Sequence, residues 1–168
     1  MVPLNDGFIQ SSITQAQLLQ DSLSCIIKIL NDYKVKGLIE PLGFKKSSLR
    51  YKSMVMKIIS NLQTDKLSIV HDTFHHSIAN ENEFFPSLTS IVHFSGVSNI
   101  YNNVELNDEH RSIVDKKDIV LNLYQIQKLL NLNYNGYFSF EPFSKTLIND
   151  KNVLQIAKRN FDYITSNI

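Results

Sequence analysis

Short apolar runs alternate along this chain with longer segments in which apolar residues recur every three or four positions. The short runs have the length and near-continuous apolar character of buried strands. They cover residues 1–4, 38–39, 67–70, 90–92 and 137–140. The longer segments have the spacing of amphipathic helices and cover residues 12–32, 48–62, 118–130 and 150–164. Strands that alternate with helices predict an α/β fold with parallel strands, in one domain over residues 1–168.

Two stretches interrupt this alternation. Residues 73–89 predict irregular chain with one short helix, closed by Pro86. Residues 97–117 are polar and charged, and a loop of that length inside a compact domain is usually functional or disordered. Because the predicted strands are short, a closed barrel is favoured over a wide open sheet.

Composition narrows the class of protein further. The chain has 168 residues, 43% hydrophobic and 20% charged, which is typical of one globular domain with a real core. A net charge of +1 gives no overall attraction to nucleic acid or to a membrane. No apolar run approaches the roughly 18 residues of a membrane span, and no secretory signal is evident, so the cytoplasm is the expected location. The single cysteine, Cys25, lies in an apolar periodic segment and is predicted to be a buried thiol.

A metal-binding side chain stands at the end of four successive strands. These residues are Glu40, Asp72, His93 and Glu141. Taken singly, each is better explained as a solvated or salt-bridged strand end. Taken together they predict one site, because the carboxyl ends of parallel strands open on the same face of a barrel. Three carboxylates and one imidazole favour Mn²⁺, Mg²⁺ or Co²⁺, with Zn²⁺ as an alternative.

Several neighbouring side chains are candidates for substrate binding. All five histidines lie between residues 71 and 110, and His75, three residues beyond Asp72, is expected to face the same cavity. Arg111, in the long loop, is a candidate for holding a substrate hydroxyl or carboxylate. Arg50 belongs to a basic run over residues 45–57, which is favoured to be a solvated helix face, although its position soon after Glu40 makes it a candidate for reaching the substrate. The alternative for His75 and Arg111 is a solvated loop position.

The other histidines are weaker candidates. His71 alternates away from Asp72 along its strand and is expected to point towards the helix layer, whereas His76 is expected to be structural or exposed. Asp108 and His110 have a D-x-H spacing that can hold a second ion, although a loop position without a metal is favoured. No glycine-rich phosphate loop, CxxC or G-x-S-x-G motif is present, so nucleophilic serine or cysteine catalysis has no support.

At these positions the chain resembles the xylose-isomerase-like TIM-barrel superfamily of sugar isomerases and epimerases. The nearest subgroup is the inosose (2-keto-myo-inositol) isomerase type. The matching segments are Ile39–Phe44, Ser47–Arg50, His71–His76, Val92–Gly96, Asp108–Arg111 and Phe138–Phe143. The D-T-F-H and F-E-P-F elements are the most specific of them, and the resemblance extends over essentially the whole chain.

The resemblance implies roles for individual residues. Glu40, Asp72, His93 and Glu141 match the four metal ligands, and His75 and Arg111 match positions that contact substrate. In the family the two glutamates also exchange protons with the substrate carbons that flank the carbonyl. The metal ion acts as a Lewis acid and stabilises an enediolate. The implied reaction is isomerisation or epimerisation of a sugar or keto-cyclitol.

The length of the chain departs from the family. A complete (β/α)₈ barrel needs about 250 residues. If Glu141 follows strand eight, then 1–4 is strand four, and the expected fold is the C-terminal portion of a barrel, strands 4–8 with their helices. Its edges are expected to need another chain, either a second copy or an N-terminal half. The alternatives are a non-catalytic remnant or subunit of a two-chain barrel and, less favoured, a zinc-dependent AP endonuclease.

Overall fold

The computed structural model describes residues 1–3, 11–101 and 103–168. Its four strands are β1 (Gly37–Ile39), β2 (Leu67–Asp72), β3 (Thr89–Phe94) and β4 (Tyr137–Phe140). Its α-helices are α1 (Ser12–Asp32), α2 (Lys52–Leu62), α3 (Thr73–Ala79), α4 (Asn122–Asn131), α5 (Lys145–Ile148) and α6 (Val153–Thr165). Two short 3₁₀ helices, η1 (Asn99–Tyr101) and η2 (Asp108–His110), lie in the long loop.

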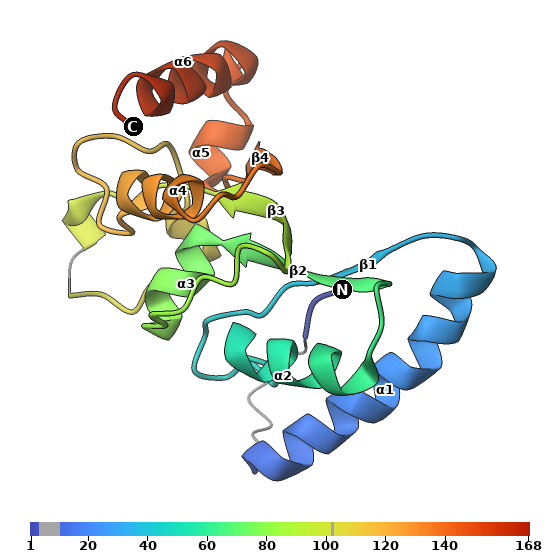
Figure 1. The fold of residues 1–168 in the computed structure, drawn as a ribbon. Coiled ribbons are helices and arrows are strands. Elements are labelled where there is room, and N and C mark those ends of the chain that lie inside the picture. The colour runs from blue at the N-terminus through green and yellow to red at the C-terminus, as the bar shows by residue number, and fades with distance from the viewer. Residues whose placement is uncertain (4–10, 102) are drawn as a thin grey trace.

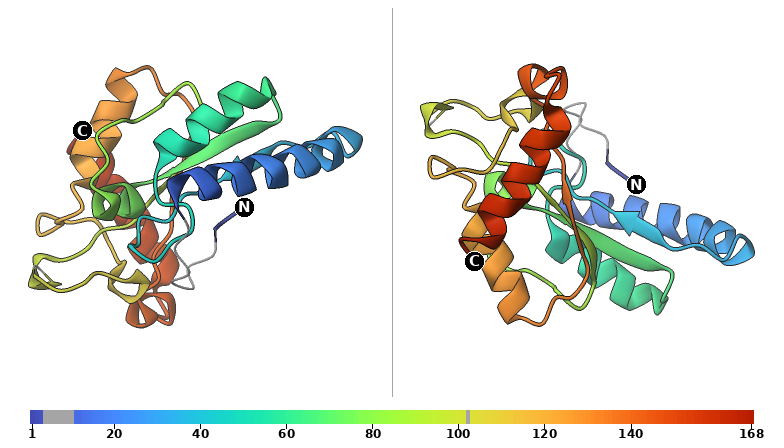
Figure 2. Two further views of the ribbon diagram at one scale, coloured as in Figure 1. Left: turned by 90° about the horizontal axis from the view of Figure 1, so that it is seen from below. Right: turned by 90° about the horizontal axis from the view of Figure 1, so that it is seen from above.

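The strands form one parallel sheet in the order β1-β2-β3-β4 (Figure 1). Helices α1 and α2 lie beside the β1–β2 end, and α4, α5 and α6 lie beside the β3–β4 end (Figures 1 and 2). The sheet does not close on itself, because β1 and β4 each have one strand neighbour in the part of the chain described. The prediction of an α/β fold that forms an incomplete barrel is therefore confirmed.

Met1 lies against the outer edge of β1. Its ammonium donates a hydrogen bond to the carbonyl of Leu38 (2.8 Å), and the N–H of Glu40 donates to the carbonyl of Met1 (2.9 Å). This is the bonding pattern of a parallel neighbour. Residues 1–3 nevertheless form no regular strand, so the strand predicted over 1–4 is not observed there, and Leu4 lies outside the described residues.

The largest core cluster fills the space between α1, α2 and the first two strands. Its buried members include Leu23, Leu30, Ile39, Val55, Ile58, Leu67 and Ile69. Gly37 permits the close approach of this layer, because a Cβ there would lie 2.7 Å from Met1 Cε and 2.9 Å from Leu30 Cδ1. Smaller clusters around Phe74, Val92 and Phe94 continue the core towards β4. The apolar faces of the helices thus pack against the sheet and hold the strands in place.

Two predicted helix starts are corrected. Helix α2 begins at Lys52 rather than after Ser47, because Ser47 closes a turn with Leu49 and the Glu81 carboxylate accepts the first helical N–H groups. Helix α4 begins at Asn122 rather than at Asp118, since the Asp118 carboxylate accepts the N–H groups of Val120 and Asn122 and so holds residues 118–121 in a turn before the helix.

Cys25 is exposed rather than buried, because the inward face of α1 passes through Leu23 and Leu30. No helix in the described ranges combines the length and apolarity that crossing a membrane requires.

Candidate metal centre

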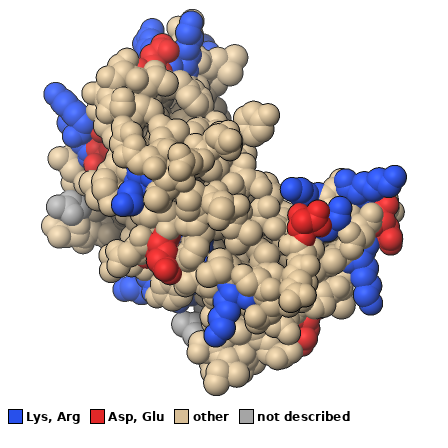
Figure 3. Space-filling model, in the orientation of Figure 1, with Lys and Arg blue, Asp and Glu red and all other residues tan. Residues whose placement is uncertain are grey.

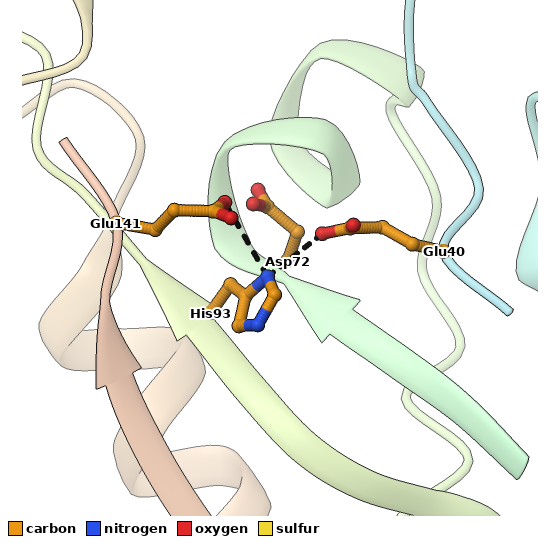
Figure 4. Close-up of side chains that lie close together, drawn as sticks. All are labelled: Glu40, Asp72, His93 and Glu141. Carbon is orange, nitrogen blue, oxygen red and sulfur yellow. Dashed lines mark hydrogen bonds and ion pairs between the residues drawn. The ribbon is translucent and has the colours of Figure 1, made fainter. Parts of the chain in front are cut away.

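Four strand ends bring their side chains to one point. Glu40 follows β1, Asp72 ends β2, His93 is the second-last residue of β3, and Glu141 follows β4. One ligand atom from each lies within 4.8 Å of the others (Figure 4). The register explains this: Asp72 is level with His93, and His93 is level with Ser139, two positions before Glu141. The prediction that these four side chains lie close together is confirmed.

His93 lies between the two glutamates. Its Nδ1 is 2.9 Å from Glu40 Oε1 and 3.3 Å from Glu141 Oε2. Burial lowers the pKa of the imidazole, but the hydrogen bonds and negative charges of Glu141 and Glu40 outweigh it and raise the pKa to about 10. Burial likewise raises the pKa of Glu141, and His93 and Arg111 outweigh it, giving about 2. The site therefore concentrates negative charge strongly enough to hold a proton on His93.

Arg111 is a second cationic side chain bonded to these carboxylates. Its Nη2 lies 2.6 Å from Asp72 Oδ2 and 2.7 Å from Glu141 Oε2, and its side chain is almost fully buried. The guanidinium is sandwiched between the rings of Phe74 and Phe143, with its Cζ 5.1 and 4.7 Å from their centroids. Ser95 Oγ accepts a further hydrogen bond from Nε. Arg111 thus lies within the charge cluster rather than in a solvated loop.

The donor set fits a divalent cation. With His93 neutral, as an imidazole bound to a metal is, three carboxylates and one guanidinium leave two negative charges, which is the charge that a divalent ion neutralises. Oxygen donors with a single nitrogen suit Mn²⁺, Mg²⁺ or Co²⁺, and Zn²⁺ also accepts this mixture. Burial raises the pKa of Asp72 even against the opposing charge of Arg111, so a further nearby cation would favour its ionised form.

His75 lies beside the cluster. Its backbone N–H donates to Asp72 Oδ1 (2.9 Å), and its ring makes edge contacts with the rings of Phe44 and Phe74. The ring is buried, and its Nδ1 has no hydrogen-bond partner among the described residues. A buried nitrogen without a partner is uncommon, so this atom marks a polar group beside the cluster that the described residues leave unsatisfied.

Arg50 holds backbone rather than pointing at the four ligands. Its Nε donates to the carbonyl of Gly43 (2.9 Å) and its Nη2 to the carbonyl of Ile78 (3.0 Å). It lines a small cavity together with Asp72 and His75. The segment after Glu40 packs closely against α3, and this requires glycine at position 43, because a Cβ there would lie 2.1 Å from the backbone oxygen of His75. Arg50 therefore fixes the segment after Glu40 against α3, and its role in substrate binding stays a prediction.

The remaining histidines have other partners. His71 points towards the helix layer, as expected, with its Nε2 3.0 Å from Gln125 Oε1 of α4. His110 Nδ1 accepts the N–H of Asn107, and Asp108 pairs with Arg111 at 3.2 Å. This D-x-H pair therefore has protein partners of its own.

Sequence reasoning missed the burial of Lys52 and His76, which contact each other. It placed Lys52 in a basic run on a helix face, whereas its side chain is only 3% exposed. The available signal was spacing: Lys52 shares the inward positions of Val55 and Ile59 on α2.

The chain matches the family described as xylose isomerase-like TIM barrel over residues 4–166. Among solved structures it is similar to a xylose isomerase domain containing protein from Salmonella typhimurium LT2. That structure is 28% identical with a TM-score of 0.86, and the match covers 98% of this chain and 62% of that one.

Two further structures share the fold at lower identity. The IolI protein with a bound zinc atom is 18% identical with a TM-score of 0.71, over 92% of this chain and 56% of that one. D-psicose 3-epimerase from Clostridium cellulolyticum H10, with D-tagatose, is 15% identical with a TM-score of 0.67, over 98% and 60%. No curated protein sequence matches the chain. The chain spans about three fifths of the length of these structures, and it belongs to the xylose isomerase-like TIM barrel family.

Proposed function

We propose that this chain carries the metal centre and the proton-transfer residues of a sugar or keto-cyclitol isomerase or epimerase that depends on a divalent ion. The observation that carries this proposal is the placement of the Glu40 and Glu141 carboxylates on opposite sides of His93 and Asp72 (Figure 4). A divalent ion bound by these four side chains would supply Lewis-acid polarisation of a substrate carbonyl. Mn²⁺, Mg²⁺ or Co²⁺ best suits the donors, and Zn²⁺ is the alternative.

The two glutamates divide the proton transfer between them. One carboxylate accepts the proton from the carbon next to the carbonyl, and the other returns a proton on the far side of the substrate. Arg111 Nη2 donates a hydrogen bond to Glu141 Oε2 (2.7 Å) and favours the ionised form of this carboxylate, so it accepts a proton only transiently. In the reverse reaction the two roles are exchanged.

The surroundings favour a substrate rich in hydroxyl groups. The Arg111 guanidinium and His75 Nδ1 place further polar groups beside the carboxylates, and Arg50 lines a small cavity next to Asp72. Structures of the same fold include a 3-keto-D-glucoside 4-epimerase and D-psicose 3-epimerase, whose substrates are polyhydroxylated carbonyl compounds by name. Basic and acidic side chains are intermixed on the face shown in Figure 3, which does not favour nucleic acid as a partner.

Hydrogen exchange at carbon tests this proposal. The chain is loaded with Mn²⁺, Co²⁺ or Zn²⁺ and incubated with inosose or a ketose in D₂O, and deuterium next to the carbonyl is measured by NMR. We expect incorporation, a loss of at least 100-fold in Glu40→Gln and Glu141→Gln, and no change in the exposed control Glu83→Gln. Equal incorporation in all four proteins would overturn the assignment of the glutamates.

A second candidate function is that of one subunit of a barrel completed by another chain, without activity of its own. The β4 edge favours it: Tyr137 is 81% exposed on a strand of a parallel sheet, and parallel strands are normally covered. The partner would be a second copy or a chain that carries the missing βα units. Adding such a chain to the deuterium assay separates the two candidates, because the subunit exchanges hydrogen only in its presence.

A further inference from the structure

A second group of convergent polar side chains lies away from the four strand ends. Lys52 on α2 is buried, and its Nζ lies 3.1 Å from His71 Nδ1 and 2.5 Å from His76 Nδ1. Glu81 Oε2 lies 3.6 Å from the same nitrogen. The three partners come from β2, from α3 and from the loop after α3, so one ammonium group joins three segments.

The hydrogen bonds fix the orientation of both imidazoles. An ammonium group only donates, so Nδ1 of each histidine must accept, with its lone pair directed at Lys52 Nζ. His71 Nε2 then carries the hydrogen and donates to Gln125 Oε1. Gln125 is consistent with this, because its Nε2 already donates to the carbonyls of Thr73 and Val120. The tautomer therefore follows from the contacts alone.

Two imidazole nitrogens point at Lys52 Nζ and a carboxylate oxygen lies 3.6 Å from it, and residues of these types bind divalent transition metals. We infer that the Lys52 ammonium is a resident cation in a two-histidine, one-carboxylate pocket and that it excludes a metal ion from this pocket. If a metal ion took its place, the distances would have to shorten to about 2.0–2.2 Å. The inference does not depend on the proposed function, because none of these residues is among the four strand-end ligands.

The enclosure explains why a cation is held there. The Phe84 ring stacks on the His71 ring, and its centroid lies 4.6 Å from that of His76 and 5.9 Å from Lys52 Nζ. The Lys52 ammonium is therefore enclosed on one side by an aromatic ring, which attracts a cation. Glu81 provides the opposite charge and also accepts the N–H groups of Lys52 and Ser53. Burial lowers the pKa of Lys52, and Glu81 raises it in part, giving about 8, so the side chain stays largely charged at neutral pH.

Counting bound zinc tests the inference. The wild-type chain, Lys52→Ala and the control Lys57→Ala, which alters an exposed lysine on the same helix, are dialysed against Zn²⁺ and measured by mass spectrometry of metal and protein. We expect Lys52→Ala to bind one ion more than wild type, Lys57→Ala to match wild type, and the double variant Lys52→Ala with His76→Ala to return to the wild-type count. No additional ion in a folded Lys52→Ala chain would overturn the inference.

A second measurement keeps Lys52 in place, in case Lys52→Ala does not fold. His76→Ala alone should bind as much zinc as wild type, because the ammonium already excludes the metal. Loss of one ion in His76→Ala would show that the pocket takes zinc despite Lys52, and the inference would fail. The difference between variants tests this pocket, whereas the absolute count for wild type tests the strand-end site, so the two failures are distinguishable.

Discussion

The Arg111 guanidinium lies 2.6 Å from the Asp72 carboxylate, and both side chains are nearly inaccessible to solvent. Breaking a buried ion pair leaves one uncompensated charge and typically costs about 3–5 kcal/mol. We therefore expect Arg111→Met to lower the free energy of unfolding by roughly that amount in metal-free buffer, measured by urea denaturation. Arg159→Met, at an exposed position, should change it by no more than about 0.5 kcal/mol.

The same variant distinguishes a metal centre from a purely structural ion pair. A divalent cation bound among the carboxylates would replace part of the lost positive charge, so Mn²⁺ should restore more stability to Arg111→Met than it adds to wild type. An equal shift in both proteins on adding Mn²⁺ would count against a cation at the strand ends.

Lys52 gives the fold a dependence on alkaline pH. Its pKa is about 8 in the folded chain and 10.5 when unperturbed, so between these values the unfolded chain binds a proton that the folded chain has lost. Stability attributable to Lys52 therefore rises as the pH goes from 8 to 10.5, by on the order of 3 kcal/mol. Above pH 10 the raised pKa of Tyr134, about 12, acts in the opposite direction.

The measurement is urea unfolding at several pH values between 7 and 10. Because the raised pKa of His93, about 10, lowers stability over the same pH range, the Lys52 contribution is measured as the difference in stability between wild type and Lys52→Met. This difference should grow as the pH rises from 8, whereas Lys57→Met should keep the wild-type profile. A difference that stays constant with pH would assign the pH dependence to other groups.

Gly43 sets how closely the segment after Glu40 approaches α3. An added Cβ would meet the backbone oxygen of His75 at 2.1 Å and the backbone nitrogen of Ala79 at 3.0 Å, and neither can turn aside. We expect Gly43→Ala to cost about 2 kcal/mol or more of stability and to weaken binding of Mn²⁺ through displacement of Glu40. Calorimetric titration and thermal unfolding measure the two effects.

Gly136→Ala is the matched control for this variant. Its added Cβ would meet the buried Tyr134 ring, which contacts none of the four ligands, so stability should fall while metal binding is unaffected. Unchanged metal affinity in a folded Gly43→Ala chain would show that the close approach at Gly43 does not position Glu40 for metal binding.

The edge of β4 is expected to associate with other chains. Sedimentation of the wild-type chain should show species larger than 19.3 kDa whose share grows with concentration. Tyr137→Lys should reduce that share, because a charge on an edge strand opposes further pairing. Tyr124→Lys, a similarly exposed tyrosine on α4, should not. A strictly monomeric wild-type chain at all concentrations contradicts this expectation.

The site was predictable where it depends on the backbone alone. Parallel strands place their carboxyl ends together, so the positions of Glu40, Asp72, His93 and Glu141 in the sequence were sufficient to bring them to one point. The spacing of apolar residues likewise predicted α1, α4 and α6 to within a few residues.

The parts that were not predictable depend on side chains distant in sequence. The start of α2 is set by Glu81, 29 positions after Lys52, and no local pattern contains that information. The burial of Arg111 depends on Asp72, 39 positions away, and on two aromatic rings around it. Periodicity describes one element at a time, so it gives the faces of helices and strands but not the pairing of charges between them.

Each of the four side chains at the strand ends comes from a different strand, and the set extends from residue 40 to residue 141. No two of them are close in the chain, so the donor set exists only after three strand pairings have formed. An ion bound there would bridge all four strands, and separating any two strands would release it. Binding of the ion and unfolding of the sheet would therefore be coupled equilibria. Metal occupancy would then report whether the whole sheet is assembled.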